Sequence, residues 1–506
     1  MPTVATHTLT QGKIQDADQI YNGLDCTITF EIWERLAKQN IPKIYDFERA
    51  LQGPALEIML RGFLIDKVER DKAVAELTEK LNILSERLDA LAKAVWDKPL
   101  NPRSVEQLKS FFYDYMRLPE CVTSIKGVSA LRMNRESLEA LAVHVHARPL
   151  INTILAIREY ASKIKVLTTD LDSDGRFRTS INVGATETGR FSSSKSTTGT
   201  GGNLFNITRE LRRPFVSDPG YKICAIDLEQ AESREVGFIC GKLFNDWAYL
   251  DACEAGDLHT RVASMVWPQL SWTGDAKADR EIAERGYYRH FTYRDMAKRN
   301  GHANNYLITP YTASRSIKCP ISICQAFKDL YFTAFPGIAK WHQWVATQLG
   351  TMQQLTTMFG RKRIFFGRPN DDSVLREAVA YEPQSCTADR LNIGMLRIWK
   401  HFGTRVQLLL QLYDAVYFQY REDDDEVEIV QKALELLDVP VWHNGRKFTV
   451  PGEAKVGWNW ADYVSEEDIN KAVAAGRPAP KLNLDGLRKF KGKDSRKRTE
   501  VLHSVL

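Results

Sequence analysis

The sequence has no CxxC pair, no long apolar run, and no basic region followed by an apolar one at its N-terminus. Its eight cysteines are scattered, so neither a zinc site nor a disulfide framework is expected, and the thiols should be free in a reducing compartment. No apolar stretch approaches the ~18 residues that a membrane helix needs, and MPTVATHTLTQ is not typical of a secretory signal. These absences predict a cytoplasmic protein without a membrane partner.

The length and the net charge of the chain exclude fewer classes of protein than these absences do. The chain has 506 residues, which is long for one hydrophobic core and suggests about three or four units of roughly 150 residues. Its hydrophobic content of 43% and charged content of 26% are ordinary for a globular protein. The net charge of +5 permits a nucleic-acid partner without requiring one.

The first third of the chain is dominated by helical patterns. Apolar residues recur every four positions in 17–39, and further helices are predicted at 46–60, 67–95 and 149–170. Residues 235–360 again favour helices. The stretch 176–215 is different, because it is rich in Gly, Ser and Thr interleaved with arginines. It could be a flexible linker or a surface that contacts phosphates through amides, hydroxyls and guanidinium groups.

Two acidic residues stand at the ends of predicted strands. The apolar run before Asp227 predicts a buried strand, and the spacing after it becomes helical from Glu229 onward. The apolar run 404–421 is interrupted at Asp414, which predicts two strands joined by a tight turn. Each aspartate could be a helix cap or a solvated turn. Alternatively, each could be a rigidly held carboxylate of the kind that metal-ion chemistry needs.

The C-terminal composition is basic. From Ser465 onward the chain contains RPAP and then LRKFKGKDSRKR, which together predict a mobile basic tail. Such a tail could serve solubility or contact a phosphate backbone.

Several motifs occur together in one order along the chain. They are TGRFSSS (188–194), NLFNI (203–207), DLEQAESR (227–234), RDMAKRNGHANNY (294–306) and QLYDA (411–415). Because of these motifs and their order, residues 50–463 resemble the polymerase part of family A DNA polymerases. This family includes bacterial DNA polymerase I and many phage replicases.

The resemblance implies an α+β right-hand polymerase fold, with an antiparallel-sheet palm and helical fingers and thumb. It also implies a division of the chain into a remnant of a 3′–5′ exonuclease domain (1–49), a thumb (50–165), a palm in two parts (166–233 and 395–464), fingers (234–394) and a basic C-terminal tail (465–506).

The resemblance further implies a site. Asp227, Asp414 and the backbone carbonyl of Leu228 are expected to hold two Mg²⁺ ions, or Mn²⁺, with Lys298 as a catalytic proton donor. Glu232 matches the family's sugar gate, which rejects a 2′-hydroxyl. The nucleotide-binding residues implied are Gln230, Glu232, His259, Arg294, Lys298, His302 and Tyr306. The DNA-binding residues implied are Thr188, Arg190, Asn206, Arg363, Gln384 and Gln411.

The chain departs from the family pattern at several of these motifs. His302 stands where the family usually has Phe or Tyr, so discrimination against dideoxynucleotides is not carried over. Tyr413 and Ala415 replace the His and Glu that usually flank the second aspartate. The secondary metal contact of that Glu is therefore not carried over either, although Glu229 adds a carboxylate nearby.

The N-terminal residues Tyr21 and Asp25 resemble the last motif of the proofreading exonuclease, Y-x-x-x-D. No DxE stretch precedes them, so residues 1–49 are interpreted as an exonuclease remnant without activity. A separate exonuclease or processivity protein is a candidate partner.

The resulting hypothesis is a template-directed DNA polymerase that adds dNTPs to a primer on template DNA. It would act as a monomer in phage DNA replication, in the host cytoplasm, without its own proofreading. Two alternatives stay open: a single-subunit RNA polymerase, which Glu232 argues against, and a non-catalytic DNA-binding replisome scaffold. Comparing dNTP with rNTP incorporation distinguishes a DNA polymerase from the RNA polymerase alternative. Primer–template binding without extension would identify the scaffold alternative.

Overall fold

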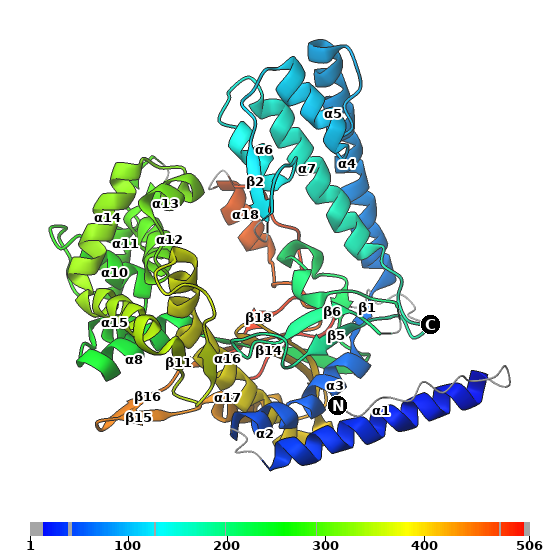
Figure 1. Cartoon of the computed structure of the whole chain (residues 1–506), viewed down its shortest axis with the longest axis vertical. Helices are drawn as coiled ribbons and strands as arrows, with labels where there is room; N and C mark the ends of the chain where they lie inside the picture. Colours follow the sequence, from blue (N-terminus) through cyan, green and yellow to red (C-terminus); the bar gives the residue numbers. More distant parts are fainter. Residues whose placement is uncertain are drawn as a thin grey trace, which may run out of the picture.

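A five-stranded antiparallel sheet forms the centre of the molecule, in a computed structural model that describes residues 14–38, 43–125, 128–197, 199–289, 291–474 and 477–499. An arm of long helices rises from the sheet on one side, and a group of shorter helices lies on the other (Figure 1). The strand order is β13-β14-β8-β17-β18. The bounds are β8 Tyr221–Leu228, β13 Val406–Leu412, β14 Ala415–Arg421, β17 Gly452–Gly457 and β18 Arg488–Lys489. The predicted α+β fold is therefore present.

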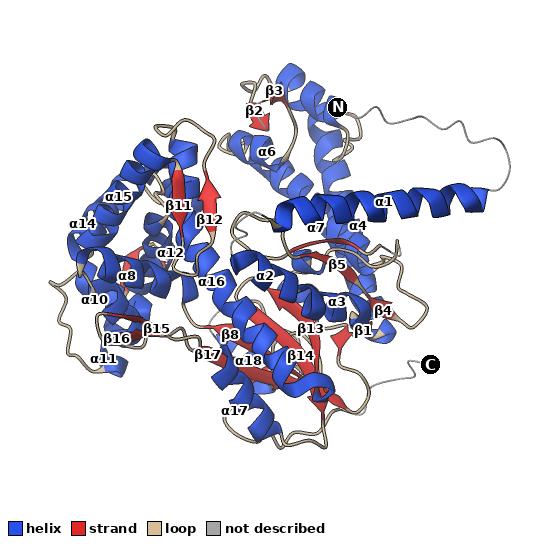
Figure 2. Ribbon diagram, turned by 60° about the horizontal axis from the view of Figure 1, so that its bottom comes forward, coloured by secondary structure: helices blue, strands red, loops and turns tan. Residues whose placement is uncertain are grey.

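Strand β8 lies in the middle of this sheet and is apolar over nearly its whole length. Cys224 and Ile226 face one core, which includes helices α16 (Asp372–Phe402) and α17 (Glu426–Leu437). Ile223 and Ala225 face a second core on the other side. Because both faces of β8 are covered, its sequence shows a continuous apolar run and not an alternating one. Figure 2 shows the strands of the sheet side by side, with α17 beside them.

The arm consists mainly of two long helices that pack along each other, α4 (Lys67–Trp96) and α7 (Arg148–Leu167). Both were predicted from apolar spacing. At the far end lie α5 (Val105–Lys109), the π-helical turn η1 (Ser110–Tyr115), β2 (Val122–Ile125), β3 (Val128–Leu131) and α6 (Arg135–Leu141).

The helical group on the other side follows directly from β8. Its helices are α8 (Ala231–Phe244), α9 (Ala248–Glu254), α10 (Leu258–Val266), α11 (Ala276–Ala283), α12 (Tyr293–Asn305), α13 (Pro310–Ile317), α14 (Ile321–Ala334) and α15 (Pro336–Met352). Short strand pairs interrupt or follow them: β9 (Gly286–Tyr288) with β10 (Phe291–Thr292), β11 (Gln354–Thr356) with β12 (Lys362–Ile364), and β15 (Val441–His443) with β16 (Arg446–Phe448). The prediction of mainly helix over 235–360 holds except for the hairpin of β9 and β10 and the strand β11.

The arginine-rich stretch 176–215 is folded where the structure describes it. It contributes β4 (Arg176–Phe177), β5 (Thr179–Asn182), β6 (Ser192–Lys195), β7 (Phe215–Val216) and the 3₁₀ turns η2 (Leu204–Asn206) and η3 (Arg209–Leu211). Strands β4 and β7 flank β1 (Phe63–Ile65). Phe177, Leu204 and Phe215 are buried in one core. The interpretation as a flexible linker is therefore wrong, because these apolar side chains anchor the stretch.

The N-terminal helix α1 (Ile14–Ala37) extends along the base of the molecule, followed by α2 (Lys43–Ala50) and α3 (Gln52–Arg61) (Figure 1). Tyr21 and Asp25 lie one turn apart on α1, and both are exposed. Trp33 stacks on Tyr45 of α2 with ring centroids 6.1 Å apart.

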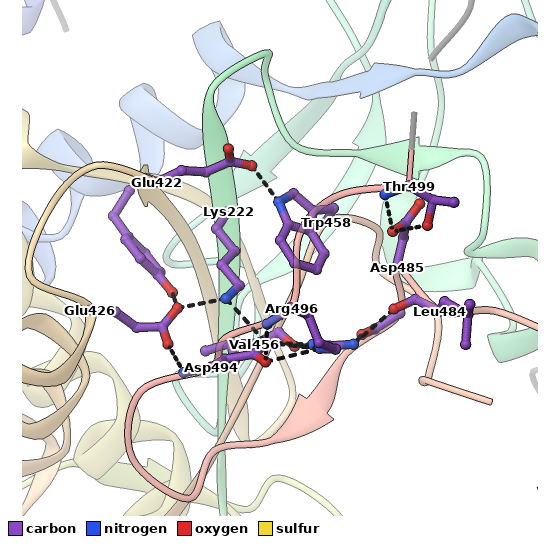
Figure 3. Close-up of polar contacts among 12 residues, drawn as sticks. Lys222, Glu422, Glu426, Val456, Trp458, Leu484, Asp485, Asp494, Arg496 and Thr499 are labelled. Carbon is purple, nitrogen blue, oxygen red and sulfur yellow. Dashed lines mark hydrogen bonds and ion pairs between the residues drawn. The ribbon is translucent and has the colours of Figure 1, made fainter. Parts of the chain in front are cut away.

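The prediction of a mobile C-terminal tail is wrong for the residues described up to Thr499. After α18 (Glu466–Ala474), β18 joins the edge of the central sheet. The buried Lys222 of β8 has its Nζ 2.7 Å from Glu426 and 3.1 Å from Asp494 (Figure 3). Arg496 donates to Asp494 and to the Val456 carbonyl. A buried lysine needs counter-charges, and this basic segment carries the aspartate that supplies one.

All eight cysteines are free thiols. None of the helices in the described ranges is long and apolar enough to cross a membrane.

Candidate active site

Asp227 and Asp414 meet at one end of the central sheet. Asp227 lies opposite Ala415, the residue that follows Asp414 in the turn between β13 and β14. The Leu228 N–H donates to the Asp414 carbonyl at 2.9 Å. Tyr413 takes a left-handed conformation, with φ of 57°, which lets the two strands turn within two residues. The register thus brings the two aspartates to the same end of neighbouring strands, and the charge of Asp414 acts on the pKa of Asp227, so the predicted juxtaposition is present.

Each of these carboxyl groups is hard to ionise. Asp227 still reaches solvent at the end of β8, but the partial desolvation of its carboxyl group and the neighbouring charge of Asp414 raise its pKa to about 7, although Lys455 and Arg209 act in the opposite direction. Burial also raises the pKa of Asp414, as does the charge of Glu232. Two adjacent carboxylates repel each other unless a proton or a cation lies between them.

The donor set suits a hard divalent cation. Mg²⁺ prefers oxygen ligands and is commonly bound by one or two carboxylates, with waters and substrate phosphates completing its shell. Asp227, Asp414 and the backbone carbonyl of Leu228 offer such oxygens. Within the described ranges, no group of three or more His, Cys, Asp or Glu side chains is placed to hold a metal. The remaining ligands would therefore come from water or substrate.

Glu232 connects three of the sequence motifs. It lies in the first turn of α8, after Gln230 in a left-handed conformation. One carboxylate oxygen of Glu232 accepts from Arg190, and the other accepts from the Tyr306 hydroxyl at 2.5 Å. His302 Nε2 lies 3.9 Å from that second oxygen. Burial and the Glu232 charge raise the pKa of Tyr306, so the hydroxyl stays protonated and remains a donor.

Helix α12 presents the predicted phosphate-binding stripe. Arg294, Lys298 and His302 lie one turn apart, and the last two are exposed. Arg294 is held by Asp257, with its Nε 2.8 Å and its Nη2 3.0 Å from the two carboxylate oxygens. Burial alone would raise the pKa of Asp257, but hydrogen bonds from Arg294 and Thr260 lower it to about 2.

His259 lies beside Asp257 at the start of helix α10. Its backbone N–H donates to Asp257, which caps helix α10, at 3.2 Å. Burial lowers the pKa of His259 to about 4, and the charges of Arg294 and Lys298 act in the same direction. The imidazole is therefore neutral at pH 7.

Three of the predicted DNA-binding residues lie near Glu232 or the Asp414 turn, and the other three lie on η2, α16 and β12. Thr188 and Arg190 lie in one loop beside Glu232, and Gln411 is buried at the end of β13, where its Nε2 donates to the Tyr413 carbonyl at 3.4 Å. Asn206 is exposed on η2, and Gln384 is half-buried on α16. Arg363 on β12 pairs with Glu377 at 2.8 Å and lies over the Phe365 ring.

Sequence reasoning missed three residues at this site. Asp257 belongs to the DLH segment 257–259, and its helix-cap position was the only signal that it positions other groups. Glu453 lies opposite Asp227 on β17, and Lys489 of β18 pairs with it. No sequence signal identifies these two, because they approach the site only through the strand register.

Comparison with known proteins places these motifs in one family. The model of DNA polymerase family A matches residues 71–462. The thermostable DNA polymerase I of Thermus aquaticus is 25% identical over 449 residues, which cover 84% of this chain and 49% of that protein. DNA polymerase I of Deinococcus radiodurans is 25% identical over 443 residues, 83% of this chain and 42% of its own length. The chain thus spans about half the length of the curated relatives it matches.

A solved structure shares the fold. The POL domain of Pol1 from M. smegmatis, in complex with DNA primer-template and dNTP, superposes with a TM-score of 0.65 at 23% identity. The match covers 81% of this chain and 69% of that one. The right-hand polymerase fold is therefore present.

Proposed function

Because the chain belongs to DNA polymerase family A, we propose that it is a template-directed DNA polymerase that adds dNTPs to a primer 3′-hydroxyl. The observation that carries this proposal is the placement of Asp227 and Asp414 at the same end of neighbouring strands of the central sheet. The segment matched by the family model, residues 71–462, contains both aspartates.

Asp227, Asp414 and the Leu228 carbonyl would hold two Mg²⁺ ions, with Mn²⁺ as a substitute. Bound there, the metals supply activation of the 3′-hydroxyl and neutralisation of the pyrophosphate leaving group. The raised pKa of Asp227, about 7, supports this assignment, because a divalent cation relieves the same repulsion that retains a proton.

Helix α12 and the start of α10 would bind the triphosphate. Arg294 has five N–H donors, of which Asp257 takes two, so the others can reach a phosphate in a fixed orientation. Neutral His259 would donate a hydrogen bond to the same phosphates. Lys298, exposed on the same helical face, would hold phosphate and deliver a proton to the leaving pyrophosphate. Gln230, whose Nε2 donates to the Gly256 carbonyl beside Asp257, and His302, exposed on α12, would border this position.

Glu232 would exclude ribonucleotides. The Arg190 and Tyr306 hydrogen bonds hold its carboxylate in place, so a 2′-hydroxyl would meet a fixed group and not a mobile one. Tyr306 would also stack near the templating base. This gate favours a DNA polymerase over the single-subunit RNA polymerase alternative.

Arg190, Gln384 and Gln411 would contact minor-groove acceptors, which all correct base pairs share, so they test shape without reading sequence. Thr188, Asn206 and Arg363 would contact the DNA elsewhere. We further propose a monomer that acts in phage DNA replication in the host cytoplasm without proofreading of its own. Residues 1–49, with Tyr21 and Asp25, would be the exonuclease remnant, and a separate exonuclease or processivity protein would be the partner.

Primer extension tests the proposal. With Mg²⁺ and dNTPs, the wild-type chain should extend a primer, and Asp227→Ala should lower the rate about a thousandfold, because several kcal/mol of charge stabilisation are lost. Asp423→Ala is a matched control, since Asp423 lies in an exposed ion pair with Arg421. Equal extension by wild type and Asp227→Ala would overturn the site. Primer–template binding by the wild type without any extension would identify the scaffold alternative.

A further inference from the structure

We propose that Lys489 is a positioning residue for the catalytic edge of the sheet. Its task is to hold the Glu453 carboxylate away from the oxygens of Asp227 and Asp414. This inference rests on the proposed function, since it concerns the cation site of that function. Lys489 lies outside residues 71–462, the segment that the family model matches.

Strand register places these groups on one face of the sheet. Glu453 of β17 is opposite Asp227 of β8, and Lys489 of β18 is opposite Lys455 of β17. Side chains opposite each other on antiparallel strands point to the same face, as do those two positions apart on one strand. Asp227, Glu453, Lys455 and Lys489 therefore share the face at which the two aspartates meet.

Lys489 and Glu453 form a direct ion pair. The Lys489 Nζ donates to the Glu453 carboxylate, and the two side chains are 57% and 28% exposed. This hydrogen bond raises the pKa of Lys489, and the charge of Glu229 acts in the same direction. The lysine is therefore charged, and its attraction directs Glu453 toward β18, the edge strand.

Without this lysine, Glu453 would be an unpaired carboxylate next to a cation site. Directly opposed residues have Cβ atoms about 5 Å apart, so a glutamate at this position can turn toward Asp227. A divalent cation would then gain Glu453 as a third carboxylate ligand. The cation would be bound more tightly, but Glu453 would also help to determine its position. The β18 segment thus keeps the site to the two aspartates.

The first experiment measures Mn²⁺ binding to the DNA-free protein by electron paramagnetic resonance. Lys489→Ala should bind Mn²⁺ about three- to tenfold more tightly than wild type, because Glu453 is released and its carboxylate can turn toward the cation. Lys489→Arg should retain the wild-type affinity. Lys491→Ala should also match wild type, because Lys491 lies exposed in the same segment and makes no ion pair with any residue that the structure describes.

The decisive comparison repeats Lys489→Ala in a Glu453→Gln background. If Lys489 acts through Glu453, the Mn²⁺ affinity should change there by less than about twofold, because no carboxylate remains at position 453 to be released toward the cation. An equal change in both backgrounds would overturn the inference, since Lys489 would then act as an independent charge. No change of affinity in Lys489→Ala would overturn it as well.

Primer extension supplies the second readout. Lys489→Ala should lower kcat at saturating Mg²⁺, leave KM for primer–template within about twofold, and recover when Glu453→Gln is added. Loss of activity without recovery would assign Lys489 to direct substrate contact and overturn the inference. A wild-type chain without extension would instead refute the proposed function, while the Mn²⁺ measurements would still decide the role of Lys489.

Discussion

Replacing Asp494 by asparagine removes one of two counter-charges of a buried lysine while keeping the size of the side chain. Lys222 is 5% exposed and pairs with Glu426 and Asp494 at 2.7 and 3.1 Å. Burial alone would raise the pKa of Asp494, but hydrogen bonds from Arg496 and Lys222 lower it from 3.8 to about 2. At about 1.4 kcal/mol per pKa unit this shift corresponds to about 2–3 kcal/mol. Solvent near the pair reduces it, so we expect Asp494→Asn to cost about 1–2 kcal/mol at pH 7.

The pH dependence follows from the sign of the shift. Because the pKa of Asp494 is lower in the folded chain, its contribution is present above 3.8 and is lost as the pH falls toward 2. The difference between wild type and Asp494→Asn in urea unfolding, followed by tryptophan fluorescence, should therefore be full at pH 7. It should shrink as the pH falls below 4.

Asp423→Asn is the matched control. Asp423 pairs with Arg421, and these side chains are 68% and 62% exposed. Its replacement should cost less than about 0.5 kcal/mol, as for most surface ion pairs. If Asp494→Asn were no more destabilising than Asp423→Asn at pH 7, the C-terminal segment would not be needed to neutralise Lys222.

Three further substitutions test the nucleotide site and the core. Burial raises the pKa of Glu382 to about 7 from 4.5, so wild-type stability should fall as the pH rises between these values. Glu382→Gln should then be more stable than wild type by about 3 kcal/mol at pH 8 but not at pH 4. A difference in the free energy of urea unfolding that is the same at both pH values would contradict this. Asp257→Asn should raise KM for dNTPs about tenfold by releasing Arg294, with KM for primer–template unchanged as the control. Tyr306→Phe removes one donor to Glu232 and should weaken ribonucleotide rejection about tenfold in single-nucleotide incorporation; an unchanged dNTP/rNTP ratio would contradict it.

The sequence was sufficient to predict features that depend on local pattern. The apolar run before Asp227 and the interrupted run around Asp414 predicted three strands, and the motif order predicted that both aspartates share a site. The long helices of the arm follow from apolar spacing for the same reason. In each case one segment carries its own signal in the types and spacing of its residues.

Features that depend on which segments become neighbours were not predictable. The basic C-terminal composition suggested a mobile tail, because nothing in residues 465–499 reveals that Lys222 is buried without enough local counter-charge. Glu453 and Lys489 likewise show no motif. Their place beside Asp227 depends on the register of β17 and β18, which only the folded sheet fixes.

The strand order of the central sheet has a consequence for synthesis on the ribosome. Strand β8 ends at Leu228, but its neighbours β14 and β17 begin at Ala415 and Gly452. At about 5–20 residues per second, the apolar β8 emerges roughly 10–40 s before either neighbour is translated. During that interval both of its edges lack partners, so a newly made chain is most vulnerable to misassembly at the strand that carries Asp227.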